Sequence, residues 1–229
     1  MVLFFLVNDR GEKEPINALI IAILFGLVTF PAAGIIETLF INSTYLNPQQ
    51  SSYKQAFLAF MLVGFIEESL KIIPLAAYIY KQKFFNEHTD GIIYFALAGL
   101  GFGIPENIIY TFQYGARAGV GRLMLTPIFH AATVAIVGYY LIQVKLNKRS
   151  WWSVVIALIG AILIHGVYDF SLSTDNPIMI SIAVAITMSI SSLLFINFLS
   201  AKKIDQLEGL ARPDKNSPKI ALQTKPNAN

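Results

Sequence analysis

Six long apolar stretches occupy most of this sequence, and they constrain its fold more than any other feature. They cover approximately residues 16–41, 55–80, 91–114, 121–144, 151–172 and 177–199. An α-helix rises 1.5 Å per residue, so about 20 apolar residues cross a hydrocarbon core of roughly 30 Å. Backbone groups in hydrocarbon must satisfy their own hydrogen bonds, so each stretch is expected to be a helix. The sequence predicts an all-α, polytopic membrane bundle of about six transmembrane helices with a polar intramembrane cavity.

The composition supports a membrane-embedded chain. Only 14% of the 229 residues are charged and 55% are hydrophobic, whereas about 25% of residues are charged in soluble domains. The loops between the stretches are too short to hold a soluble domain, so any chemistry must come from side chains within the bilayer. We expect residues 1–200 to form one membrane domain and residues 201–229 to be a disordered, basic tail. The absence of cysteine excludes disulfides, thiolate metal sites and cysteine nucleophiles.

Basic residues are distributed unevenly between the two sides of the predicted bundle. Nine lie near one side and three, Lys54, Arg117 and Arg122, near the other. Because cytoplasmic loops are enriched in Lys and Arg, both termini, including the tail, are expected in the cytoplasm of a protein integral to the cell membrane. Residues 2–7 form an apolar run too short to span, which predicts an interfacial segment or the remnant of a longer helix. The glycines and proline of residues 99–105 allow a kinked or broken third span.

Polar residues inside the predicted spans are the candidate functional groups. They are Glu67, Glu68, Lys71, Glu106, Asn107, His130, His165 and Asp169. A single charged residue at a helix centre costs about 2.5–3.5 kcal/mol, so these side chains are expected to face one another in one cluster at similar depth. Three spacings support local pairs on one helix face: Lys71 can pair with either Glu67 or Glu68, and His165 with Asp169.

The charge of this set indicates a functional site. Four carboxylates and one ammonium leave a formal charge of −3 in hydrocarbon when both histidines are neutral, which requires bound protons, charged histidines or a divalent cation. The sequence contains neither H-E-x-x-H nor G-x-S-x-G. Two routes to amide hydrolysis stay open. A glutamate can take a proton from the attacking water, or histidines and carboxylates can hold Zn²⁺ with a free position for water.

Four motifs on consecutive spans resemble those of the PrsW family of intramembrane proteases. Residues 67–71 (EESLK) resemble its E-E-x-x-K motif, and residues 102–107 (FGIPEN) resemble its F-x-x-x-E motif. His130 matches its isolated histidine, and residues 165–169 (HGVYD) resemble its H-x-x-x-D motif. The order is the same, and the resemblance extends to the wider superfamily of CAAX-prenyl endopeptidases and bacteriocin-immunity membrane proteins. Family members usually have another membrane helix before a stretch that resembles residues 5–15.

The resemblance implies an intramembrane endopeptidase that cleaves membrane-anchored proteins, including an anti-sigma factor. Glu67 is implied as the base that activates water, with Glu68 paired to Lys71, and His165 with Asp169 near the oxyanion or metal. The implied catalytic residues are Glu67, Glu68, Glu106, His130 and His165, with Lys71, Asn107 and Asp169 in support. If Zn²⁺ is used, the candidate ligands are Glu67, Glu106, His130 and His165.

Two other functions remain open on the sequence alone. Carboxylate and histidine relays also serve proton- or cation-coupled transporters, and a non-catalytic immunity or binding protein can share the same scaffold. The expected partners are a membrane-anchored protein substrate and the lipid bilayer, without nucleic acid. His88, beside Glu87 and Asp90, is expected in a solvent-exposed loop.

Overall fold

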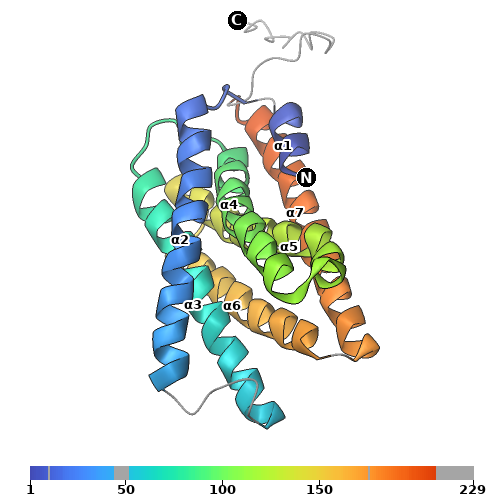
Figure 1. Cartoon of the computed structure of the whole chain (residues 1–229). Coiled ribbons are helices and arrows are strands. Elements are labelled where there is room, and N and C mark those ends of the chain that lie inside the picture. Colours follow the sequence, from blue (N-terminus) through green and yellow to red (C-terminus); the bar gives the residue numbers. More distant parts are fainter. Residues whose placement is uncertain (10, 44–51, 175, 210–229) are drawn as a thin grey trace, which may run out of the picture.

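The chain forms seven α-helices in the computed structural model, which describes residues 1–9, 11–43, 52–174 and 176–209 (Figure 1). No strand occurs within these ranges. The helices are α1 (Val2–Asn8), α2 (Ile16–Ser43), α3 (Tyr53–Ile79), α4 (His88–Tyr114), α5 (Ala116–Lys145), α6 (Trp151–Ser173) and α7 (Pro177–Leu207). The predicted all-α architecture is confirmed.

Among the described residues, five helices are long and apolar enough to cross a membrane. They contain the segments Ile16–Phe40, His88–Gln113, Leu125–Lys145, Trp151–Ser173 and Pro177–Leu207. Helix α3 has 27 residues and matches the remaining predicted span in length, but Glu67, Glu68 and Lys71 make it more highly charged than the other five. Helix α7 continues to Leu207, beyond the boundary expected at residue 200, and residues 210–229 of the predicted tail lie outside the described residues.

Local sequence signals mark where several helices begin. Ser52 and Gln55 form a capping box at the start of α3, and Glu87 and Asp90 form a second one at the start of α4. At the start of α7, the side chain of Asn176 accepts a hydrogen bond from the backbone N–H of Ile178. These side chains satisfy N–H groups that have no partner inside the helix, which stabilises each helix start.

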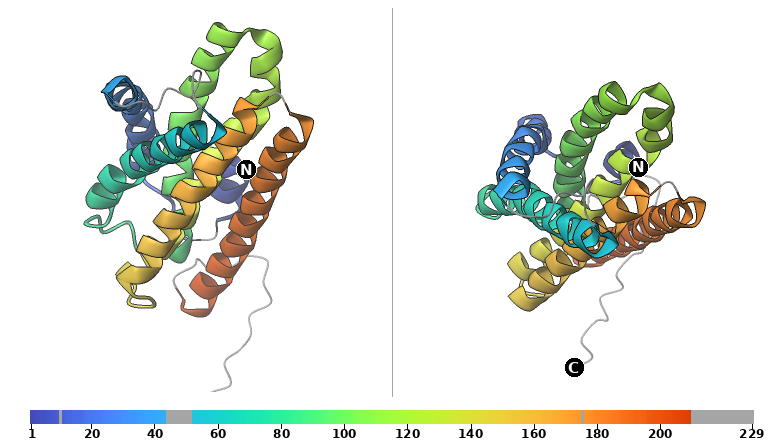
Figure 2. Two further views of the ribbon diagram at one scale, coloured as in Figure 1. Left: turned by 90° about the horizontal axis from the view of Figure 1, so that it is seen from below. Right: turned by 60° about the horizontal axis from the view of Figure 1, so that its bottom comes forward.

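Helices α4 and α5 form the centre of the bundle. Their most apolar segments are 67% and 72% buried, whereas those of α2, α6 and α7 are each 22% buried. Helices α2, α3, α6 and α7 follow one another around this pair, as the two views in Figure 2 show. The peripheral helices therefore expose apolar surface to lipid, while the central pair supplies the protein core.

Glycines bring the helices that carry the polar residues close together. A Cβ atom on Gly64 of α3 would lie 2.8 Å from the carbonyl oxygen of Ile162 on α6, and one on Gly99 of α4 would collide with the backbone of His130 on α5. Small residues at membrane helix contacts allow such close approach. Helix α4 is continuous past Pro105, so the broken third span allowed by the sequence does not occur.

The short helix α1 packs on the last long helix, as Figure 1 shows. The ring of Phe5 is fully buried and stacks on that of Phe198 with 4.5 Å between centroids. Phe4 and Phe195 add a second ring contact at 5.5 Å. The apolar run, predicted to be an interfacial segment or the remnant of a longer helix, is thus anchored to the bundle by aromatic packing.

The expectation that His88 is solvent-exposed is wrong. Its side chain is buried, with Nδ1 2.7 Å from Oδ1 of Asp205 on α7. The same carboxylate accepts hydrogen bonds from the backbone N–H groups of His88 and Thr89, at 2.8 and 3.1 Å. The first N–H groups of a helix need outside acceptors, and Asp205 supplies them from the end of α7. This contact explains why α7 extends beyond the predicted apolar stretch.

Candidate active site

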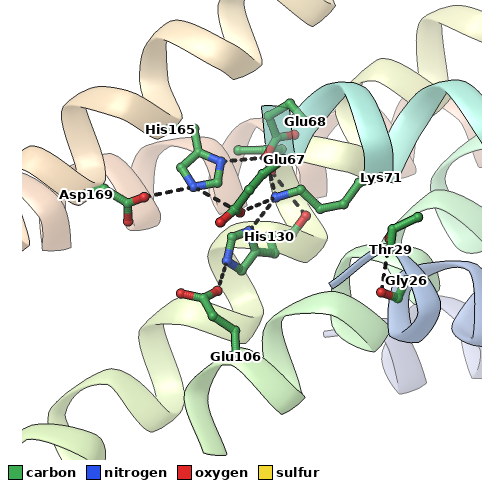
Figure 3. Close-up of polar contacts among 10 residues, drawn as sticks. Gly26, Thr29, Glu67, Glu68, Lys71, Glu106, His130, His165 and Asp169 are labelled. Carbon is green, nitrogen blue, oxygen red and sulfur yellow. Dashed lines mark hydrogen bonds and ion pairs between the residues drawn. The ribbon is translucent and has the colours of Figure 1, made fainter. Parts of the chain in front are cut away.

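Four helices bring seven of the eight predicted polar residues into one cluster, as Figure 3 shows. These are Glu67, Glu68 and Lys71 on α3, Glu106 on α4, His130 on α5, and His165 and Asp169 on α6. Asn107 is buried, but neither of its amide atoms has a hydrogen-bond partner among the described residues. The prediction of a single cluster is confirmed for the other seven.

Lys71 lies at the centre of the cluster. Its Nζ is 2.7 Å from Oε1 of Glu68, 3.2 Å from Oε2 of Glu67 and 2.9 Å from Nδ1 of His130. The ammonium also lies 4.3 Å from the ring centroid of Phe102. An ammonium has three N–H donors, and these three acceptors account for all of them. The spacing predicted that Lys71 can pair with either glutamate, and in the structure it contacts both.

The contacts of His130 determine which ring nitrogen carries its proton. The ammonium of Lys71 can only donate, so Nδ1 of His130 accepts. Nε2 then carries the proton and donates to Oε2 of Glu106 at 2.5 Å. Glu106 therefore holds the ring from the side opposite to Lys71.

Carboxylates face both ring nitrogens of His165. Nδ1 lies 2.7 Å from Oε1 of Glu68, and Nε2 lies 3.1 Å from Oδ2 of Asp169 and 3.4 Å from Oε2 of Glu67. The contact with Asp169 confirms the pair predicted from their spacing. The contacts with α3 depend on the close approach at Gly64 and Gly166.

Aromatic packing holds α5 and α6 in place beside these imidazoles. Phe129 and Tyr168 stack with 3.9 Å between ring centroids and an interplanar angle of 9°. The hydroxyl of Tyr168 is 3.1 Å from Oγ1 of Thr126, and the ring of Phe129 meets that of His165 edge-on at 5.4 Å. These contacts fix the ring of His165 and leave it little rotational freedom.

Three members of the cluster can hold a metal ion. Glu67, His130 and His165 each offer one ligand atom, and these atoms lie within 4.8 Å of one another. One carboxylate and two imidazoles match the three-ligand sets of catalytic zinc sites, which keep a fourth position open. The carboxylate of Glu68 on Nδ1 of His165 is the kind of outer contact that orients a metal-binding imidazole. Glu106 lies outside this group and contacts its member His130.

Sequence reasoning missed Glu37 on α2. Its Oε1 is buried without a hydrogen-bond partner among the described residues, and its carboxylate lies within electrostatic range of Glu67, Asp169 and His165. The signal was available, because Glu37 is the only ionisable residue in the first apolar stretch. A fifth helix thus contributes a carboxylate near the cluster.

Comparisons with known proteins find relatives that are named as proteases. The chain is 32% identical to Protease PrsW of Bacillus subtilis over 174 residues, which cover 74% of this chain and 76% of that protein. It is 32% identical to Protease PrsW of Halalkalibacterium halodurans over 72% of this chain and 74% of that protein. It is 28% identical to Protease PrsW of Geobacillus kaustophilus over 94% of this chain and 90% of that protein. No solved structure matches the chain significantly.

A family-level match covers the same region as the helices that build the cluster. Residues 14–196 match the family described as PrsW family intramembrane metalloprotease. The match supports a protease rather than a transporter or a non-catalytic binding protein. The chain belongs to the PrsW family of intramembrane metalloproteases.

Proposed function

We propose that this protease hydrolyses peptide bonds of membrane-anchored proteins with a water molecule activated by Glu67. The observation that carries the proposal is the convergence of Glu67, His130 and His165, whose ligand atoms lie within 4.8 Å of one another inside the helical bundle. Groups from three helices meet at this point. Placing such polar groups in hydrocarbon costs free energy, so their presence indicates a function.

The two adjacent glutamates differ in accessibility, which assigns them different roles. The side chain of Glu68 is 0% exposed and its Oε1 accepts from both Lys71 and His165. The side chain of Glu67 is 9% exposed, so this carboxylate can meet a water molecule. Glu67 is therefore the base, and Glu68 positions Lys71 and His165.

Hydrolysis then follows from the residues around Glu67. The carboxylate of Glu67 accepts a proton from water as the water oxygen bonds to the carbonyl carbon of the substrate. The imidazole of His165, whose Nε2 lies 3.4 Å from Oε2 of Glu67, stabilises the negative charge that develops on the carbonyl oxygen. The C–N bond breaks as Glu67 returns the proton to the leaving amine, so the base is regenerated with each turnover.

The donor set of Glu67, His130 and His165 fits Zn²⁺. A zinc ion bound there would polarise the carbonyl oxygen in place of the N–H group of His165, and it would lower the pKa of the attacking water. Binding through His130 would replace one of its hydrogen bonds to Lys71 and Glu106. Lys71 would then remain paired with Glu68.

The exposed members of the cluster support a membrane-anchored substrate. The side chains of Glu106 and Asp169 are 19% and 14% exposed, whereas those of Lys71 and Glu68 are fully buried. Glu106 lies eight residues before the end of α4, roughly 12 Å along the helix axis. A substrate chain reaches the site at this depth, on the extracytoplasmic side in the predicted orientation. An anti-sigma factor with a single membrane span is such a substrate.

The decisive experiment uses the detergent-purified protein and a panel of single-span membrane proteins that includes an anti-sigma factor. We expect the wild type to cut at least one of them and Glu67→Gln to cut none, while a control, Glu12→Gln, with an exposed side chain remains active. Loss of cleavage with a zinc chelator, reversed by added Zn²⁺, supports the metal. Full cleavage by Glu67→Gln overturns the assigned base.

A further inference from the structure

A cavity of about 310 Å³ lies between α5, α6 and α7, and none of the residues that line it belongs to the polar cluster. Its floor includes the buried residues Ala161 and Ile190, and its outer edge includes Ile156 and Leu193, which are 68% and 48% exposed. The edge belongs to helices that are apolar enough to span a membrane. The cavity therefore opens towards lipid, and its volume is in the range of small-ligand pockets.

The length of the cavity corresponds to one leaflet. It follows α6 from Ser153 near the helix start to Ile164, which is eleven residues or about 16 Å along the axis. This is about half of a hydrocarbon core of roughly 30 Å. Gly160 in the middle contributes no side chain, and a Cβ atom placed there would meet no atom within 4 Å. The cavity is thus an apolar channel with the length of one acyl chain.

A cation marks the surface end of the channel. Arg149 lines the cavity two residues before α6 begins, with its guanidinium 5.3 Å from the ring centroid of Tyr140. Its Nε donates to Oε1 of Gln143, which uses one of five N–H donors, and no carboxylate pairs with it among the described residues. The neighbouring Lys148, in contrast, is paired with Glu208 at 2.6 Å.

We propose that this cavity binds an anionic phospholipid, with one acyl chain in the channel and the phosphate on Arg149. Guanidinium groups bind phosphate through two parallel hydrogen bonds, and basic pockets between membrane helices hold anionic headgroups. Trp151 and Trp152, at the start of α6, are 56% and 72% exposed and place the same end at the headgroup level.

The chain contains only two tryptophans, two and three residues after Arg149 in the sequence, so their fluorescence reports on lipid near the start of α6. The purified protein is reconstituted in phosphatidylcholine vesicles that contain increasing fractions of phosphatidylglycerol with brominated acyl chains, or of brominated phosphatidylcholine. Bromine quenches tryptophan on contact. We expect the anionic lipid to reach half-maximal quenching at a mole fraction at least threefold lower than the neutral lipid.

Matched variants test whether the preference for the anionic lipid arises at this cavity. Arg149→Gln removes the preference for the anionic lipid, whereas Lys148→Gln keeps it. Gly160→Leu fills the channel and removes the preference, whereas Gly34→Leu on α2, where a Cβ atom also meets nothing, keeps it. Thermal unfolding midpoints of Arg149→Gln and Gly160→Leu close to that of the wild type show that each variant is folded.

Equal quenching by both lipids in the wild type overturns the proposal, and so does a preference that survives Arg149→Gln. The natural chain lacks cysteine, so Gly160→Cys introduces a single thiol into the channel. Rapid disulfide formation between two copies of Gly160→Cys in vesicles assigns the channel to a second copy of the chain instead. Protection of this thiol that requires phosphatidylglycerol supports the lipid.

Discussion

The Nζ atom of Lys71 lies 2.9 Å from Nδ1 of His130, although 59 residues separate them along the chain. This contact joins α3 to α5, and it continues through Nε2 of His130 to Glu106 on α4. One buried ammonium thus sets the proton position on an imidazole that belongs to the proposed metal-binding group. The stability of the bundle and the arrangement of the site depend on the same residue.

Lys71→Met is expected to destabilise the protein strongly, because it leaves the fully buried carboxylate of Glu68 without its cation. Breaking a buried ion pair by removing one partner costs about 3–5 kcal/mol in free energy of unfolding. The matched control is Lys148→Met, whose pair with Glu208 is exposed and contributes about 1 kcal/mol or less. Thermal unfolding in detergent compares the two. Equal midpoints would show that Lys71 does not stabilise the cluster.

Glu67→Gln and Glu68→Gln are both expected to lose cleavage activity, but for different reasons. Loss of the proposed base lowers kcat by about 10²- to 10⁴-fold with little change in the unfolding midpoint. Loss of the charge at Glu68 weakens contacts to both Lys71 and His165, so the midpoint falls together with activity. Cleavage rates and melting curves of the two variants provide the comparison. A destabilised Glu67→Gln with residual activity, beside a stable and inactive Glu68→Gln, would reverse the two roles.

Metal content tests the proposed ligands independently of any substrate. The wild type is expected to retain one Zn²⁺ per chain after dialysis, and His130→Ala and His165→Ala to retain much less, because each removes one of three ligands. The third histidine of the chain, His88, contacts Asp205 and lies outside this group, so a folded His88→Ala should retain the metal. Elemental analysis of the purified proteins measures the zinc content per chain. Unchanged zinc in both ligand variants would contradict this site.

Gly64→Ala is expected to lower activity more than tenfold, because its methyl group would separate α3 from α6. The added Cβ atom would lie 2.8 Å from the carbonyl oxygen of Ile162 and 3.0 Å from the backbone nitrogen of Gly166. Small displacements of catalytic groups reduce rates strongly, and overpacking costs about 1–3 kcal/mol in stability. Gly34→Ala, with open space around the new atom, serves as the control. A wild-type kcat in Gly64→Ala would show that a small displacement of α6 from α3 does not affect catalysis.

The carboxyl group of Glu87, directly before α4, is expected to make the stability of the protein depend on pH. Burial raises the pKa of Glu87 to about 7, and nearby Asp9 and Asp205 act in the same direction. The folded state therefore binds a proton that the unfolded state has released, so stability is highest below about pH 4.5 and falls as the pH rises to about 7. Unfolding midpoints at a series of pH values should fall less in Glu87→Gln than in the wild type. If the exposed control Glu12→Gln reduced the pH dependence of the midpoint equally, this dependence could not be assigned to Glu87.

The contacts within one helix could be predicted from the sequence. Lys71 with Glu67 and Glu68, and His165 with Asp169, lie three or four residues apart, and the regular turn of an α-helix places such residues on one face. The cost of isolated polar groups in hydrocarbon also predicted that these residues would gather. Glu37 was missed although it follows the same rule, because it lies alone in its apolar stretch.

The sequence by itself determined the membrane helices and the set of polar residues that must face inward, because hydrocarbon excludes unpaired polar groups whatever the helix arrangement. Only the tertiary structure decided which residues of different helices touch. Contacts such as Lys71 with His130, Glu68 with His165, and His88 with Asp205 join different helices. Their geometry depends on how closely the helices approach at residues such as Gly64 and Gly99, and helix periodicity contains no information about that approach.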